Sequence, residues 1–320
     1  MTEDILGSPY TRETLDLGAD AEGALTATLV RRPAENTVAS ATDGKPRGAV
    51  LYLHGFVDYF FQRELGDWWA AQGYDFYALD LRKYGRSHTD GQTFYYTEDL
   101  ADYDLEINRA WQLITGRDGH RKVVLMAHST GGLIAPLWAH RTQPAELTAL
   151  ILNSPWLDHF DPPLVRVALT AGVSALARVK PRAIVQPAKN DPAAESLHQK
   201  FGGEWSFDEN WKTFDFPPIY AGWLAAIRRA QRQLHRGLDV RVPVLVMSSA
   251  RSGRMKTRTQ KHDFDAVLNV QHIRRWAPVL GRQVTSLVIE GAVHDIFLSP
   301  PAVRSDAYSQ LGHWVRRYLH

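Results

Sequence analysis

Residues 126–132 read MAHSTGG and follow directly on a short apolar run. An apolar, helix-like pattern begins at once behind them, so a strand must turn sharply into a helix at Ser129. Such a turn strains the backbone, and the residues two positions away must be small. Gly131 meets this need fully, and Ala127 meets it less well. The stretch favours a nucleophilic serine exposed at a helix N-terminus, and the alternative is a serine that serves only as a helix N-cap.

Short apolar runs that suit buried strands recur on both sides of this turn. They cover residues 48–55, 75–82, 122–129, 147–154, 242–249 and 284–291, after two further predicted strands at 10–18 and 23–32. Helical patterns lie between them, at 61–73, 97–116, 131–143 and 301–319. Strands that alternate with helices indicate an α/β protein with a parallel sheet and right-handed crossovers.

The alternation is interrupted between Ser154 and Val242 by a segment rich in aromatic residues. This segment contains an apolar, helix-like stretch at 162–179, and the alternation resumes after it. We therefore expect residues 156–238 to form an inserted helical cap on a core made of residues 1–155 and 239–320. The alternative is a second, independent domain.

Composition limits the partners and the chemistry of the chain. The formal net charge of +2 gives no electrostatic reason to expect nucleic acid or an anionic membrane as a partner. Cysteine is absent, which excludes a cysteine nucleophile and thiolate metal ligands. No metal or organic cofactor motif is found, so no cofactor is expected. The acidic N-terminal stretch lacks the pattern of a signal peptide, and no run is long enough for a membrane span, so a cytoplasmic protein is expected. The oligomeric state is left open.

A serine hydroxyl is a poor nucleophile unless a base, an orienting acid and an oxyanion site accompany it. His294 follows the run 284–291 directly and precedes the last helical pattern, which favours it as the base. The oxyanion site needs two backbone N–H groups. We expect these to come from Thr130, directly after the serine, and from Phe56, after the turn that ends the run 48–55.

The acid should follow the strand predicted at 242–249, but Arg251 and no carboxylate stands there. The next carboxylates are Asp263 and Asp265. Asp265 leads straight into a helical pattern, from which a loop acid can reach the histidine. Asp265 is therefore favoured, and Asp263 is the alternative.

Four motifs together resemble a known family: LYLHGF, LDLRKYGRS, AHSTGGL and EGAVHDIFLS, at residues 51–56, 79–87, 127–133 and 290–299. The combination looks like the α/β-hydrolase fold. More narrowly, it looks like the capped hydrolases grouped with lysophospholipases, monoacylglycerol lipases and serine aminopeptidases, over about residues 20–319. The resemblance implies a mostly parallel eight-stranded sheet flanked by helices, with a helical cap. It also implies a triad of Ser129, Asp265 and His294. Two positions depart from the family: Ala127 replaces the first glycine of the turn, and an insertion at 251–264 displaces the acid.

The resemblance implies a serine hydrolase that cleaves a small-molecule carboxylic ester with an apolar acyl or alcohol group. Aromatic residues that follow Phe56 or lie in the predicted cap could line its pocket, and the candidates are Tyr59, Phe60, Trp156 and Trp223. The alternative for these aromatics is core packing. The same triad could also serve an aminopeptidase, an amidase or an acyltransferase, and a non-catalytic binding protein of this fold is a more remote alternative.

Overall fold

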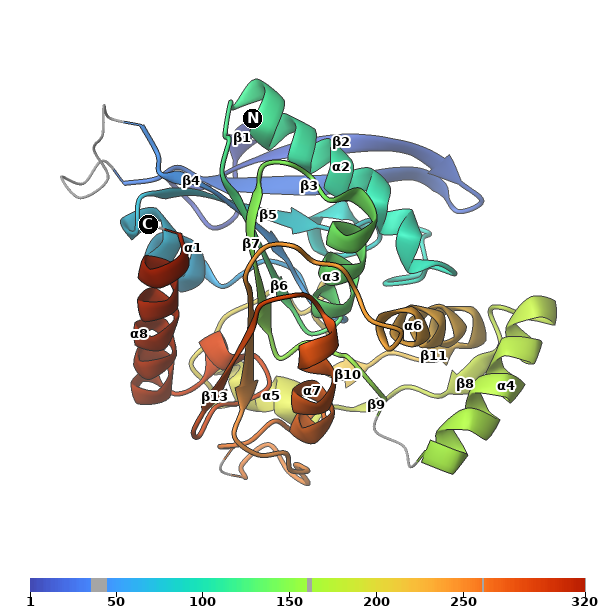
Figure 1. Ribbon diagram of the computed structural model, residues 1–320. Coiled ribbons are helices and arrows are strands. Elements are labelled where there is room, and N and C mark those ends of the chain that lie inside the picture. Colours follow the sequence, from blue (N-terminus) through green and yellow to red (C-terminus); the bar gives the residue numbers. More distant parts are fainter. Residues whose placement is uncertain (36–44, 160–162, 261, 320) are drawn as a thin grey trace.

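The computed structural model describes residues 1–35, 45–159, 163–260 and 262–319, which fold around one central sheet (Figure 1). Its nine strands lie in the order β1-β2-β3-β5-β4-β6-β7-β12-β13. Their bounds are Thr2–Glu3, Thr11–Asp20, Gly23–Arg32, Tyr74–Asp80, Gly48–Leu53, Val123–His128, Leu147–Asn153, Val244–Ser249 and Val284–Ile289 in that order. Pairs from β5 to β13 are parallel, and the pairs that involve β1, β2 and β3 are antiparallel. The mostly parallel sheet is confirmed, with a ninth strand, β1, whose two residues are too few to form a pattern.

The central strands are buried on both faces, which is why their sequences read as nearly continuous apolar runs. In β6, successive residues point to opposite faces of the sheet. Leu125 and Ala127 enter one core cluster, and Val124 and Met126 enter the other. All of these side chains are fully buried. The sheet thus holds the end of β6, where Ser129 follows, in a fixed position.

Helices cover both faces (Figure 1). On one face, α1 (Arg63–Ala71) and α8 (Pro301–Tyr318) pack against the strands, with Trp69 and Leu311 fully buried. The other face carries the remaining core helices, which are α2 (Asp104–Gln112), α3 (Gly131–Thr142) and α7 (Val270–Trp276). None of the helices in the described ranges is both long and apolar enough to cross a membrane.

The chain between β7 and β12 supplies a group of elements at one end of the sheet (Figure 1). They are α4 (Pro163–Val179), β8 (Ile184–Gln186), β9 (Lys189–Asn190), α5 (Pro192–Leu197), β10 (Asp215–Phe216), β11 (Ile219–Tyr220) and α6 (Ala221–Leu234). Helix α4 packs against α6, and α6 also contacts α3 of the core. We call residues 163–238 the cap segment. The proposed division into a core and a cap at 156–238 stays a prediction, and within it residues 160–162 lie outside the described ranges.

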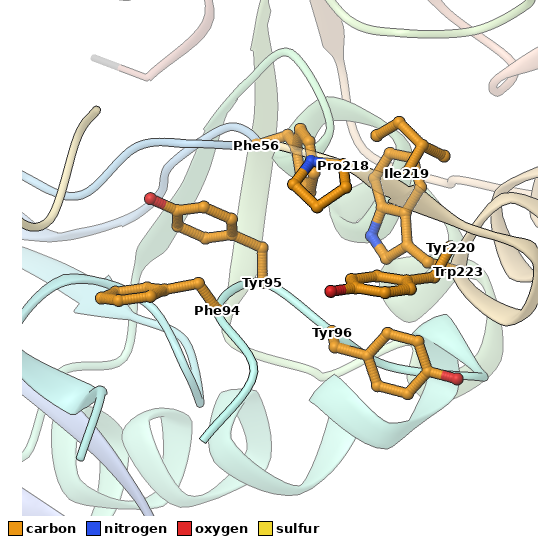
Figure 2. Close-up of a pocket in the computed structure, with 8 residues that line it drawn as sticks. All are labelled: Phe56, Phe94, Tyr95, Tyr96, Pro218, Ile219, Tyr220 and Trp223. Atoms are coloured by element: carbon orange, nitrogen blue, oxygen red, sulfur yellow. The ribbon is translucent and has the colours of Figure 1, made fainter. Parts of the chain in front are cut away.

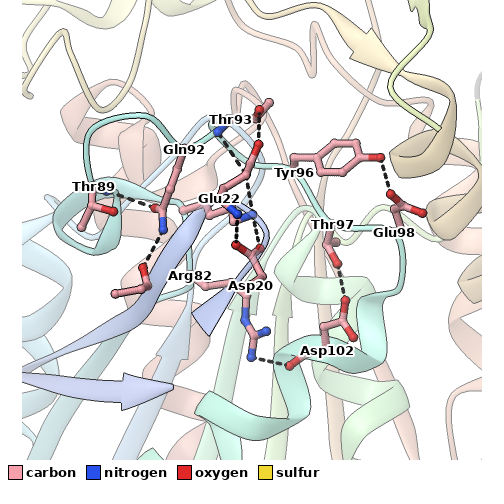
Figure 3. A network of polar contacts seen from close by, with 12 residues as sticks. Asp20, Glu22, Arg82, Thr89, Gln92, Thr93, Tyr96, Thr97, Glu98 and Asp102 are labelled. Carbon is pink, nitrogen blue, oxygen red and sulfur yellow. Dashed lines mark hydrogen bonds and ion pairs between the residues drawn. The ribbon is translucent and has the colours of Figure 1, made fainter. Parts of the chain in front are cut away.

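A loop after β5 is held in place by polar contacts with the hairpin of β2 and β3 (Figure 3). Glu22 accepts hydrogen bonds from the hydroxyl of Thr93, at 2.7 Å, and from its backbone N–H, at 3.3 Å. The buried ammonium of Lys83 lies 2.6 Å from the same carboxylate. Farther along, Thr97 donates to Asp102 at 2.7 Å. These contacts fix the aromatic run between them, which lines the pocket described below.

Candidate active site

Ser129 lies on a strained turn between β6 and α3, as the sequence predicts. Its φ of +52° is in the left-handed region, which non-glycine residues rarely adopt. A Cβ atom added to Gly131 would lie 2.5 Å from the carbonyl oxygen of His54 and 2.7 Å from that of Leu53. Both atoms belong to the backbone at the end of β4, which cannot move aside, so only glycine fits at this position. The close approach brings the start of α3 against the end of β4.

Three predicted residues form a continuous hydrogen-bonded chain. The Oγ atom of Ser129 lies 3.0 Å from Nε2 of His294, and Nδ1 of His294 lies 2.9 Å from Oδ2 of Asp265. When Nδ1–H donates a hydrogen bond to the carboxylate, Nε2 has its lone pair directed at the serine hydroxyl. The structure thus brings together a hydroxyl, a base and an acid from loops that follow three different strands.

Asp265 reaches His294 although a 14-residue insertion was expected at 251–264. The chain leaves β12, makes an excursion and returns beside its own start, where Asp265 pairs with Ser252 in a parallel bridge. Its N–H donates to the carbonyl of Arg251, and its carbonyl accepts from the N–H of Gly253, both at 2.9 Å. Asp263, the alternative, is instead at the surface and forms an ion pair with Arg251. The loop therefore carries Asp265 back to the end of β12.

The Asp265 carboxylate is fully buried, yet its surroundings favour the ionised form. Burial raises its pKa, but His294 and two backbone N–H groups more than offset this, so that the pKa lies below the usual range for an aspartate. Those N–H groups belong to Val267 and Leu268 and lie 2.8 and 2.7 Å from Oδ1. An ionised acid is what a histidine base needs to remain oriented and to be stabilised when it gains a proton.

The two amides expected to form the oxyanion site lie on segments that touch each other. A Cβ atom added to Gly55 would be 3.0 Å from Cβ of Ser129, so the loop carrying Phe56 passes directly beside the serine. Thr130 is the N-cap residue of α3. Among the backbone hydrogen bonds of the described residues, neither the Phe56 nor the Thr130 N–H has a carbonyl acceptor. Both donors are therefore available to an oxyanion at the helix N-terminus.

A small aromatic pocket lies beside Phe56 (Figure 2). Its cavity volume is about 10 Å³, roughly the room for one water molecule and far below the few hundred Å³ that are usual for a small-molecule site. The ring of Phe56 lies 4.2 Å from that of Trp223 and 5.4 Å from that of Tyr95, measured between centroids. The lining residues are Phe56, Phe94, Tyr95, Tyr96, Pro218, Ile219, Tyr220 and Trp223. The pocket thus combines the Phe56 loop, the loop after β5 and the cap segment.

The four aromatic residues predicted for the pocket lie in different places. Trp223 lines the pocket, and the ring of Trp156 lies 5.9 Å from it. The Tyr59 hydroxyl accepts a hydrogen bond from the backbone of the cap segment, and its ring contacts Trp211. Phe60 packs into the core on the α1 face. The structure thus brings Trp156 and Trp223 together near the serine, whereas Tyr59 and Phe60 support the loop.

Several residues at the site were not found from the sequence. The run Phe94–Tyr96 lines the pocket, and three consecutive aromatics in a loop after a strand were the available signal. Asp58 and His128 are buried beside the predicted residues. Their ligand atoms and a carboxylate oxygen of Asp295 lie within 4.8 Å of one another, as a metal site would require. Their closeness to Phe56 and Ser129 in the sequence was a signal, but their burial could not be read from it.

The sheet order, the strained serine turn and the acid and histidine on later loops define an α/β-hydrolase architecture. The profile of the family described as serine aminopeptidase, S33, matches residues 44–301. The chain belongs to this family, and the predicted resemblance is confirmed.

Solved structures of similar proteins share the fold over nearly the whole chain. A soluble variant of monoglyceride lipase from Saccharomyces cerevisiae, in complex with a substrate analog, is similar with a TM-score of 0.70 and 16% identity, over 96% of this chain and 95% of that one. The monoacylglycerol lipase of Paleococcus ferrophilus is similar with a TM-score of 0.66 and 17% identity, over 91% and 98%. At such identities the likeness shows the fold.

A sequence relative matches a smaller part of the chain. Phospholipase YtpA of Bacillus subtilis (strain 168) is 28% identical over 115 residues, which are 35% of this chain and 42% of that protein. The chain therefore matches less than half the length of this relative.

Proposed function

We propose that the protein is a serine hydrolase that cleaves carboxylic esters with an apolar acyl or alcohol group, through an acyl-enzyme on Ser129. The observation that carries the proposal is the hydrogen-bonded chain from Asp265 through His294 to Ser129, with the serine on a strained turn. Monoacylglycerol lipases and a phospholipase among the similar proteins support the choice of substrate class. A cytoplasmic location remains part of the proposal.

The geometry supports a two-step reaction. Ser129 Oγ attacks the ester carbonyl while Nε2 of His294 takes its proton, and ionised Asp265 stabilises the imidazolium. The amides of Phe56 and Thr130 bind the negative charge on the carbonyl oxygen. The leaving alcohol takes the proton from His294, which leaves the acyl group on the serine. A water molecule then attacks the acyl group while His294 takes its proton. His294 gives this proton to Ser129 Oγ as the acyl–serine bond breaks, which releases the acid and restores the serine.

An ester fits the site better than a peptide with a free amine. An aminopeptidase must bind the substrate's ammonium group, and a carboxylate is the usual partner for it. The residues that line the described pocket are aromatic, with one proline and one isoleucine. Such walls suit an apolar acyl or alcohol group.

A panel of p-nitrophenyl esters from acetate to palmitate, beside aminoacyl p-nitroanilides, tests the proposal. We expect ester turnover with an optimum at short acyl chains, because the pocket beside Phe56 leaves little free room. We also expect a fluorophosphonate to label Ser129. Turnover of the anilides alone would indicate a peptidase on the same triad. Absence of turnover and of labelling would favour a binding protein.

Truncating Trp223 should shift the enzyme toward longer acyl chains. Its buried ring packs against Phe56 in a tilted arrangement, so an alanine opens the pocket next to the proposed oxyanion site. We expect the ratio of kcat/KM for octanoate to that for butyrate to rise about tenfold in Trp223→Ala. This is about the effect of burying one or two more methylene groups of the acyl chain in an apolar pocket. Trp205→Ala is the matched control, because Trp205 packs against Phe61 outside this pocket. If the octanoate-to-butyrate ratio of kcat/KM were the same in both variants, the acyl group would not bind in the pocket beside Trp223.

A further inference from the structure

Behind the serine and histidine lies a cluster of buried charged side chains. Asp58 follows the proposed oxyanion residue Phe56 by two positions, and His128 directly precedes Ser129. Asp295 directly follows His294. Asp58, His128 and Asp295 are 1%, 5% and 6% exposed. The cluster therefore contains one residue from each of three segments, which are the Phe56 loop, the Ser129 turn and the loop that carries His294.

Lys212 of the cap segment reaches into this cluster. Its Nζ atom lies 2.9 Å from Oδ1 of Asp58 and 3.5 Å from the carbonyl oxygen of Val57. The side chain is 13% exposed and lies over the rings of Phe61 and Phe207, at 5.5 and 5.7 Å from their centroids. An ion pair so shielded from water interacts more strongly than one at the surface. The contact therefore ties the cap segment firmly to the loop beside Ser129.

Asp58 links Lys212 to the turn that carries the serine. Its second oxygen, Oδ2, lies 3.5 Å from Nδ1 of His128, which is the spacing of an ion pair but too long for a strong hydrogen bond. Burial raises the pKa of Asp58, but Lys212 and His128 outweigh it and hold the pKa well below the usual range. Burial lowers the pKa of His128, but Asp295 and Asp58 raise it overall. Two carboxylates thus face the ammonium of Lys212 and the imidazole of His128.

The same three residues have the composition of a metal site, and the chain satisfies only part of it: both oxygens of Asp295 and Oδ1 of Asp58 have donors, whereas Oδ2 of Asp58 and the two ring nitrogens of His128 have no hydrogen-bond partner among the described residues. Asp295 accepts from Gln62 Nε2 at 2.9 Å and from Asn153 Nδ2 at 2.7 Å. Lys212 occupies Oδ1 of Asp58. The ammonium of Lys212 therefore supplies at Asp58 the positive charge that a metal would otherwise supply.

The backbone that Lys212 contacts is strained. Val57 has a φ of +51°, in a region that a β-branched residue rarely adopts. Such a conformation persists only where the surrounding structure holds it. Lys212 touches Val57 and the next residue, Asp58, and Val57 is directly bonded to Phe56. The cap segment therefore contacts the strained residue that directly follows Phe56.

We propose that Lys212 is a positioning residue that holds the loop of residues 56–58 in the conformation that completes the oxyanion site. The site is then complete only while the cap segment is seated on the core. The inference rests on the proposed function, because Lys212 would act by positioning a loop that stabilises the transition state of that reaction.

The test compares Lys212→Met, which keeps the stem and removes the charge, with the wild type on p-nitrophenyl butyrate. We expect kcat to fall about 30-fold and KM to change by less than about threefold, since an oxyanion site acts on the transition state. Affinity for an alkyl boronic acid, which forms a tetrahedral anion on the serine, should fall in parallel with kcat. Lys212→Arg, which keeps the charge, should recover part of the loss. Lys200→Met is the matched control, because Lys200 is an exposed lysine of the cap segment paired with Glu209.

Several outcomes would overturn the inference. These are a kcat within about twofold of the wild type, an equal loss in Lys200→Met, or boronic acid affinity that does not follow kcat. About one metal ion per purified chain, with activity lost on chelation, would also overturn it, because the metal would then hold Asp58. If the methionine variant does not fold, Lys212→Gln replaces it, with the same fall expected. A wild type without ester turnover or fluorophosphonate labelling refutes the proposed function as well, whereas an active wild type with an unaffected variant refutes only the role of Lys212.

Discussion

Replacing Ser129 with alanine should lower kcat for p-nitrophenyl butyrate by about 10⁴- to 10⁶-fold, the range seen when a triad nucleophile is removed. The variant has no group to form the acyl-enzyme, and only the oxyanion site and substrate binding remain to assist water. Fluorophosphonate labelling, read by mass spectrometry of the intact chain, should disappear together with turnover. The fold should remain, because the mutation removes a single oxygen atom and adds no bulk to this buried position.

Ser154→Ala is the matched control for this experiment. Ser154 follows the neighbouring strand β7, has a φ of +45° and is fully buried, so the two serines share a similar backbone strain and burial. We expect its alanine variant to keep kcat within about threefold of the wild type. Near-normal turnover in Ser129→Ala, or an equal loss in both variants, would contradict the nucleophile and favour the alternative, in which Ser129 serves only as a helix N-cap.

The central fold could be predicted because local sequence determines it. The strands β4, β6, β7 and β12 are buried on both faces, and each therefore appears as an apolar run without help from distant residues. The sharp turn at Ser129 is equally local, because the small residues it requires lie two positions away. His294 follows from the place of the last strand. In contrast, β1 was missed, since two residues that pair only with β2 leave no periodicity.

The acid and the pocket depend on contacts that the sequence does not show. Asp265 is distinguished from Asp263 by its bridge to Ser252, which closes the insertion back onto β12. Phe60 was grouped with Tyr59, but in an irregular loop neighbouring side chains have no fixed alternation, and Phe60 turned into the core. The partnership of Lys212 with Asp58 joins residues 154 positions apart. Such pairings appear only when the chain is folded.

Replacing Asp265 with asparagine should lower kcat by about 10³- to 10⁴-fold while the protein remains folded. The two backbone N–H groups at Oδ1 will keep the asparagine oxygen facing them. Its Nδ2 group then faces His294 and donates to Nδ1, where the carboxylate accepts. Nδ1 becomes an acceptor, the proton moves to Nε2, and the base can no longer take the proton of Ser129. The loss should appear in kcat, and the rate at which a fluorophosphonate labels Ser129 should fall in parallel.

The same variant should alter the dependence of stability on pH. Because the folded-state pKa of Asp265 lies below its unfolded value, the stability that the ionised carboxylate adds is present above the unfolded pKa and is lost as the pH falls through the folded one. The difference in unfolding free energy between the wild type and Asp265→Asn should therefore begin to shrink as the pH falls below about 4, the ordinary pKa of an aspartate, and continue to shrink at lower pH. Urea titrations at several pH values measure this difference.

Asp263→Asn is the matched control for Asp265→Asn. It shows whether a loss of kcat is specific to Asp265 or follows from removing any negative charge from this loop. Asp263 lies two residues away, carries the same charge and pairs with Arg251 at the surface, where an ion pair contributes little. We expect its variant to retain kcat within about twofold, because no contact among the described residues connects Asp263 to His294. A large loss in Asp263→Asn together with an active Asp265→Asn would transfer the acid to Asp263, and the buried bond between Asp265 and His294 would then have only a structural role. The comparison decides which carboxylate orients the base, since the two variants remove the same charge from the same loop.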